Sequence, residues 1–114
     1  MNVATALAKI SYAPYPAANV AAVLQQELID AVRGNAERKG AAVPFSDAEL
    51  AELSTFIDSL AVVELLCAVD DVLPFEVGEC VVRAGGYNSV AAAVKHLVGR
   101  IETQWIRYHT GVKV

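Results

Sequence analysis

The apolar residues between positions 90 and 105 constrain the fold more than any other feature of this sequence. They recur at intervals of three and four residues, which places them on one side of an α-helix. Asn88 or Ser89 can cap the start of this helix, and the pattern predicts that it runs to about Tyr108. A helix with one apolar face must bury that face against other elements. The residues on the predicted buried face are Val90, Ala93, Val94, Leu97, Val98, Ile101 and Trp105.

The same spacing predicts a long helix that begins at Pro16 or Ala17 and ends near Glu37. Gly34-Asn35 could end this helix early, and Gly40 should end it in any case. Its apolar stripe consists of Val20, Val23, Leu24, Leu28 and Val32.

A third helix is predicted from Ser59 to about Val72, because Pro74 cannot continue it. Two shorter helical pieces are predicted in the connections. Ser46 followed by Glu49 is a capping box that favours a short helix through Leu53, and a helical turn is possible over residues 79–83. The spacing places Leu60, Val63, Leu66, Cys67 and Val69 on the inward side of the third helix.

These elements predict an all-α protein, a small bundle of three longer helices and one or two short ones. The 114 residues suffice for one domain, and 55% hydrophobic with only 7% aromatic residues predicts an aliphatic core. We expect a loosely ordered N-terminal lead-in over residues 1–15, the bundle over residues 16–108 and a C-terminal tail over residues 109–114.

Composition also excludes several classes of function. A formal net charge of -4 argues against a nucleic-acid partner. No apolar run has the length of a membrane span, and no secretory signal is evident, so we expect a cytoplasmic protein with Cys67 and Cys80 reduced. Neither His96 nor His109 lies at ligand spacing from a cysteine, so no metal site is predicted. Both histidines lie off the apolar stripe and are expected to be solvent-exposed, and Cys67 is expected to be buried.

The tripeptide Asp58-Ser59-Leu60 is the strongest candidate for a functional motif. It lies where a polar stretch gives way to the third helix, so the positive end of the helix dipole favours a phosphate on Ser59. Taken alone, the tripeptide also fits a simple helix cap. Its context is more specific: Val63-Glu64-Leu65 follows on the next turn, and Tyr87-Asn88-Ser89-Val90 begins the last helix.

This arrangement resembles the acyl carrier protein family, the phosphopantetheine-binding carrier proteins, over roughly residues 18–98. The family hallmark is Asp-Ser-Leu followed by an aliphatic residue and Val-Glu-Leu. The resemblance implies that Ser59 receives a covalent 4'-phosphopantetheine arm from coenzyme A, transferred by a magnesium-dependent phosphopantetheinyl transferase. The thiol of that arm would hold acyl groups as thioesters. The resemblance further implies that Asp58, Leu60, Val63 and Glu64 form the surface that the transferase and acyl-transferring or synthase enzymes recognise.

The sequence departs from the family pattern in two respects. Ala61 and Val62 occupy positions that are usually acidic, so recognition would depend more on apolar contact and would suit a dedicated partner. That favours a specialised lipid, polyketide or nonribosomal peptide pathway, without distinguishing a fatty acyl, aminoacyl or polyketide cargo. The last helix also extends about two turns beyond the expected end. We expect Trp105 and Tyr108 there to pack against the first helix or the N-terminal tyrosines Tyr12 and Tyr15, with a docking patch for a partner or a second copy as the alternative.

Two other classes of function compete with a carrier. A helical interaction module could keep the carrier fold without a prosthetic group. A serine hydrolase would need a nucleophile elbow of the form Gly-x-Ser-x-Gly, which is absent around Ser59, and no triad is apparent. We therefore predict that the chain is not an enzyme.

Overall fold

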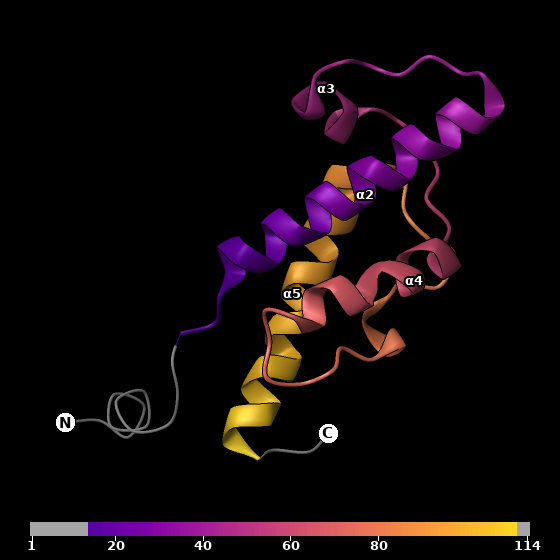
Figure 1. Cartoon of the computed structure of the whole chain (residues 1–114). Helices are drawn as coiled ribbons and strands as arrows, with labels where there is room; N and C mark the ends of the chain where they lie inside the picture. Colours follow the sequence, from indigo (N-terminus) through magenta and orange to yellow (C-terminus); the bar gives the residue numbers. More distant parts are fainter. Residues whose placement is uncertain (1–13, 112–114) are drawn as a thin grey trace.

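The computed structural model describes residues 14–111, and helices account for most of this part of the chain (Figure 1). Residues 14–111 contain no β-strand, only an isolated antiparallel bridge between Ile57 and Tyr87. The all-α prediction is confirmed, with three longer helices and two short ones. In chain order these are α2 (Ala17–Lys39), α3 (Asp47–Glu52), α4 (Ser59–Asp70), the 3₁₀ turn η1 (Glu79–Val81) and α5 (Val90–Thr110).

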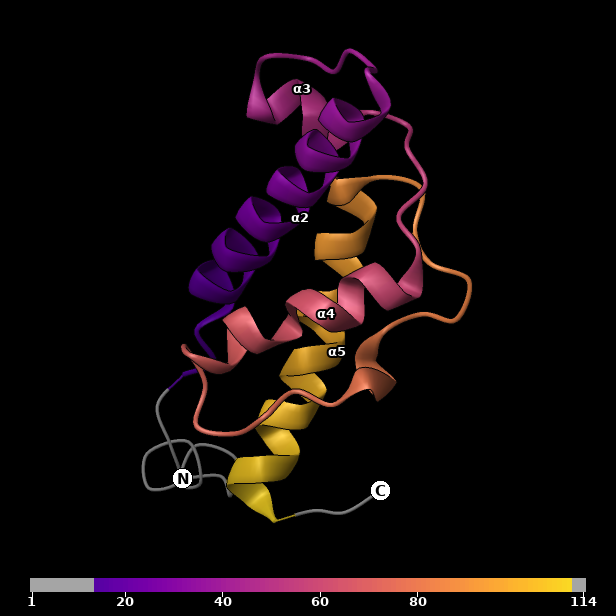
Figure 2. The same ribbon diagram turned by 45° about the vertical axis from the view of Figure 1, so that its right-hand side comes forward.

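Helix α2 packs against both α4 and α5, while α3 covers the end of the bundle where it contacts α2 and α5 (Figure 2). The core between them is aliphatic as predicted, with Tyr87 as the largest fully buried side chain, and no buried residue in the described part of the chain is polar or charged. Removing these aliphatic side chains from water is the main force that holds the bundle together. The fully buried residues of α2 and α5 are Val20, Leu24, Leu28, Ile29, Val90, Ala93, Leu97 and Ile101.

Helix α2 continues through Gly34-Asn35 and ends at Gly40, which adopts the left-handed conformation at φ 68°. The N–H groups of Gly40 and Ala41 satisfy carbonyls of the last turn. The connection that follows is held by Arg33, which donates to the carbonyl of Pro44 at 2.9 Å and forms an ion pair with Asp47 at 2.8 Å. Ser46 is the N-cap residue of α3, and its hydroxyl accepts from the Glu49 N–H at 3.4 Å, which is one of the two bonds of the predicted capping box.

Helix α5 has the buried face that the spacing predicts, although Val94 and Val98 are only partly buried. It ends at Thr110, slightly beyond the predicted end, because Gly111 adopts φ 73° and terminates it. Trp105 is buried and packs against Tyr15 in a tilted arrangement with ring centroids 5.7 Å apart, as the packing interpretation of the C-terminal extension predicts. Tyr108 is half exposed and contacts Phe75. Tyr12, residues 1–13 of the expected lead-in and residues 112–114 of the expected tail lie outside the described residues.

The face predicted for α4 is partly wrong. Its buried residues are Val62, Leu66 and Val69, whereas Leu60 is 65% exposed, Cys67 is exposed and Val63 is only partly buried. Apolar side chains occur on nearly every side of this helix, so their spacing does not select one face. Contact with α2 selects it instead.

Candidate functional site

A short antiparallel pairing fixes the chain immediately before α4. The N–H of Ile57 donates to the carbonyl of Tyr87 and the N–H of Tyr87 donates to the carbonyl of Ile57, each at 2.8 Å. The N–H of Thr55 donates to the carbonyl of Asn88 at 2.8 Å. These three bonds hold the segment that leads into Ser59 against the segment that leads into α5.

Gly86 permits this close approach. It is buried at φ +80°, a conformation that L side chains rarely adopt, and a Cβ there would overlap the carbonyl oxygen of Ile57 and crowd Asp58. Its neighbour Gly85 has φ +90° with open space around it. The glycine pair therefore forms the turn, and Gly86 alone lies against the chain that precedes Ser59.

Asp58, and not Ser59, caps α4. One carboxylate oxygen of Asp58 accepts from the N–H of Leu60 at 2.7 Å and from the N–H of Ala61 at 3.3 Å, and its carbonyl accepts from Val62. Ser59 is the first residue of the helix and is partly exposed. Its hydroxyl is thus not needed for the cap, so it can be modified without removing the bonds that start the helix.

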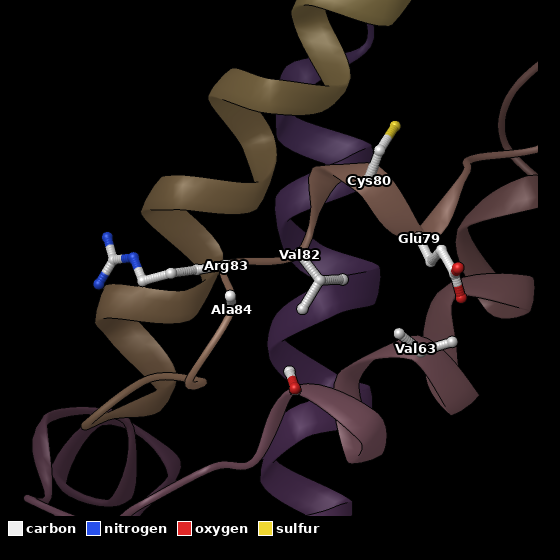
Figure 3. Close-up of a pocket in the computed structure, with 7 residues that line it drawn as sticks. Val63, Glu79, Cys80, Val82, Arg83 and Ala84 are labelled. Carbon is white, nitrogen blue, oxygen red and sulfur yellow. The ribbon is translucent and has the colours of Figure 1, made fainter.

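Ser59 lies on the wall of an open hollow of about 330 Å³ between the start of α4 and the segment around η1. Val63, one turn along the helix, lies on the same wall, and the opposite side carries both an acidic and a basic residue. Figure 3 shows the Arg83 side chain extending away from the other labelled side chains. Its guanidinium lies 5.1 Å from the centre of the Tyr87 ring. The lining residues are Ser59, Val63, Glu79, Cys80, Val82, Arg83 and Ala84.

Three of the four predicted recognition residues are exposed, and the fourth, Val63, lines this hollow. Asp58 and Glu64 are exposed, Leu60 is exposed beside Ser59, and Val63 is partly buried on the wall of the hollow. Sequence reasoning missed Phe56, which is 66% exposed just before the bridge. The signal available in the sequence was that Phe56 is an aromatic residue outside every apolar helical stripe.

Sequence reasoning also missed a partly buried polar contact between Tyr87 and α5. The Tyr87 hydroxyl lies 2.7 Å from Nδ1 of His96 on α5, so His96 is not simply solvent-exposed. Burial, with help from the positive charges of Arg83 and Arg100, lowers the pKa of His96 below its ordinary value. His109 likewise has a partner, since its Nδ1 lies 3.0 Å from the Trp105 carbonyl.

Neither a metal site nor a membrane-spanning helix is found in the described part of the chain. Residues 14–111 hold no group of three or more side chains suited to a metal ion. Among these residues, no helix combines the length and the apolar character that a membrane crossing requires. Cys67 and Cys80 are both free and exposed, which corrects the expectation that Cys67 is buried. No protein-family model, curated protein or solved structure matches this chain.

Proposed function

We propose that this chain is an acyl carrier protein that bears a 4'-phosphopantetheine arm on Ser59 and is not itself an enzyme. The observation that carries the proposal is the position of Ser59. It is the first residue of a 12-residue helix, it is partly exposed on an open hollow, and a different residue, Asp58, caps the helix. A phosphodiester on Ser59 would occupy the end of the helix that favours negative charge.

The surroundings suit such an arm. The hollow beside Ser59 combines apolar side chains, Val63 and Val82, with the carboxylate-bearing Glu79, and an amide-rich chain can contact both kinds of group. When bound, the arm supplies a terminal thiol that carries acyl groups as thioesters. Tethering the thiol keeps its cargo at high effective concentration for successive enzymes.

The surface around Ser59 also supports recognition by partner enzymes. Phe56 and Leu60, 66% and 65% exposed, flank the Asp58-Ser59 pair, and Glu64 adds a negative charge one turn further along α4. A transferase or client enzyme with an apolar pocket and a basic rim would complement this surface. A specialised cytoplasmic pathway with a dedicated partner fits this largely apolar surface best.

The modification can be tested by intact-mass measurement after incubation with coenzyme A, magnesium and a broad-specificity phosphopantetheinyl transferase. We expect one mass increase that matches the arm, and no increase for Ser59→Ala. Ser54→Ala is the matched control, since Ser54 is an exposed serine five positions earlier and should leave the increase intact. An unmodified wild-type protein, or a modified Ser59→Ala variant, would contradict the proposal.

A helical interaction module without a prosthetic group is the second candidate. The exposed pair Phe56 and Leu60 favours it, because an apolar surface of this kind can bind a protein whether or not Ser59 is modified. In that case Ser59→Ala would retain partner binding, whereas Leu60→Gln would lose it. For a carrier, Ser59→Ala would abolish the biological activity.

A further inference from the structure

Tyr87 connects the chain before Ser59 to the middle of α5. Its side chain is 1% exposed, and its backbone makes both 2.8 Å bonds to Ile57. The hydroxyl at the far end of the same residue lies 2.7 Å from Nδ1 of His96. One buried residue therefore contacts the entry to α4 through its backbone and α5 through its side chain.

The hydrogen bonds around the Tyr87 hydroxyl indicate which group donates in its bond with His96. The N–H of Arg83 donates to this oxygen at 3.0 Å, so the oxygen already acts as an acceptor. The hydroxyl proton is then available for Nδ1 of a neutral His96 that carries its own proton on Nε2. The two rings also contact each other with centroids 5.4 Å apart, and the guanidinium of Arg83 lies over the Tyr87 ring.

We propose that Tyr87 and His96 are positioning residues whose hydrogen bond holds the 82–88 segment against α5 and so fixes the backbone that presents Ser59. The last step of this inference rests on the proposed function, whereas the coupling between His96 and the Ile57–Tyr87 bridge does not. If the bond is lost, the bridge keeps its backbone partners but loses its anchor on α5. The entry to α4 then opens more often.

The same contact makes the anchor sensitive to acid. A proton on Nδ1 of His96 removes the acceptor for the Tyr87 hydroxyl. The charged groups that act on His96 are the guanidinium groups of Arg83, from the 82–88 segment, and Arg100, from α5 itself. Arg83 repels a positive charge on His96 across the contact, so protonation weakens the hold of the 82–88 segment on α5, whereas Arg100 opposes protonation from within α5.

The coupling is tested by amide hydrogen exchange at Ile57 and Tyr87, which report directly on the bridge. Tyr87→Phe loses both the hydrogen bond to His96 and the one from the Arg83 N–H, whereas His96→Ala loses only the first. Loss of one hydrogen bond of ordinary strength should speed exchange about fivefold in His96→Ala, and exchange in Tyr87→Phe should be at least as fast. In His96→Asn, the side-chain oxygen can replace Nδ1 as the acceptor. The protection factors of the two amides, which correct for the intrinsic effect of pH on exchange, should therefore stay high and no longer change with pH between 5 and 7. Lys95→Ala, at an exposed neighbouring position on α5, is the matched control.

The role of the anchor in presenting Ser59 is tested by the rate of modification of the same variants. We expect a slower rate in Tyr87→Phe and His96→Ala, with recovery in His96→Asn. Unchanged amide exchange in both disruptive variants would overturn the coupling. Faster exchange with an unchanged modification rate would overturn the positioning role alone. A wild-type protein that is never modified would overturn the proposed function, and the exchange data would still decide the coupling.

Discussion

Asp58 and Ser59 divide two tasks that adjacent residues at a helix start often share. Asp58 occupies the N-cap position and accepts hydrogen bonds from the N–H groups of Leu60 and Ala61, while Ser59 lines the open hollow. The sequence predicts the motif but not this division, because either residue type can cap a helix. The hydrogen bonds of the structure assign the cap to Asp58. A substitution of Ser59 should therefore reduce the free energy of unfolding by less than the loss of a helix cap would.

The division predicts different stabilities for two neighbouring variants. Asp58→Ala should lower the free energy of unfolding by about 1 kcal/mol, because two N–H groups lose their acceptor, and Asp58→Asn should retain most of that stability. Ser59→Ala should change the free energy of unfolding by less than about 0.5 kcal/mol. Urea unfolding followed by circular dichroism measures both. Equal losses in the two alanine variants would show that Ser59 shares in the cap.

Gly86 provides a second prediction at the scale of single residues. Gly85→Ala should cost about 1–3 kcal/mol through backbone strain at positive φ. Gly86→Ala carries the same strain and must also displace the carbonyl of Ile57, so it should be the more destabilising of the two and should open the bridge. Thermal unfolding compares their stabilities, and the chemical shift of the Ile57 amide reports the bridge. A Gly86→Ala protein as stable as Gly85→Ala would contradict the close approach.

The helices differ in how well their sequence predicts their packing. Helix α5 alternates apolar and polar residues with a clear period, and its buried face matches the prediction. In α4 the apolar residues surround the helix, so the prediction assigned Leu60 and Cys67 to the core where the structure buries Val62. Local spacing identifies a face only where a polar face opposes it. Where apolar residues surround a helix, as in α4, contact with the neighbouring helix determines which face is buried.

A matched pair on α4 tests the observed face. Leu66→Ala should lower the free energy of unfolding by about 2–5 kcal/mol, because it removes a buried side chain and leaves a cavity. Cys67→Ala, the next residue on the exposed side, should change it by less than about 0.5 kcal/mol. Chemical denaturation of the two variants under reducing conditions makes the comparison. A large loss in Cys67→Ala would restore the face that the spacing predicted.

At the scale of the whole molecule, contacts between distant segments place the site, and these are what the sequence does not reveal. The pattern predicts where α4 and α5 begin, but it contains no sign that Tyr87 bonds to both Ile57 and His96. Such contacts join residues that have no shared period. Two such contacts involve titratable groups: His96 with Tyr87, and Tyr15 with the carbonyl of Val98. The stability of the bundle should therefore depend on pH in both the acid and the alkaline range.

The acid end depends on His96. Its pKa is lowered in the folded protein by burial and by Arg83 and Arg100, so the unfolded chain binds this proton more readily. The stability that neutral His96 contributes should therefore be complete above its ordinary pKa of 6.5 and decline as pH falls below that value. Unfolding free energies of the wild type and His96→Asn between pH 5 and 8 provide the measurement. The difference between them should change in the acid range, and a constant difference would contradict the assignment.

The alkaline end depends on Tyr15, which ties the chain before α2 to α5. Its hydroxyl donates to the carbonyl of Val98 at 2.9 Å, and burial, with a smaller effect from the negative charge of Glu102, raises the pKa of Tyr15 from 10.0 to about 12. The folded protein thus holds this proton in a range where the unfolded chain releases it, so the stability due to Tyr15 should be complete below pH 10.0 and fall as pH rises toward about 12. Tyr15→Phe keeps the ring against Trp105 but lacks the proton and its hydrogen bond, which should lower the free energy of unfolding at neutral pH by about 1 kcal/mol. Its stability should then decline less steeply above pH 10 than that of the wild type, as measured by urea unfolding at a series of alkaline pH values. Parallel declines in the two proteins would mean that Tyr15 is not held in its protonated form by the fold.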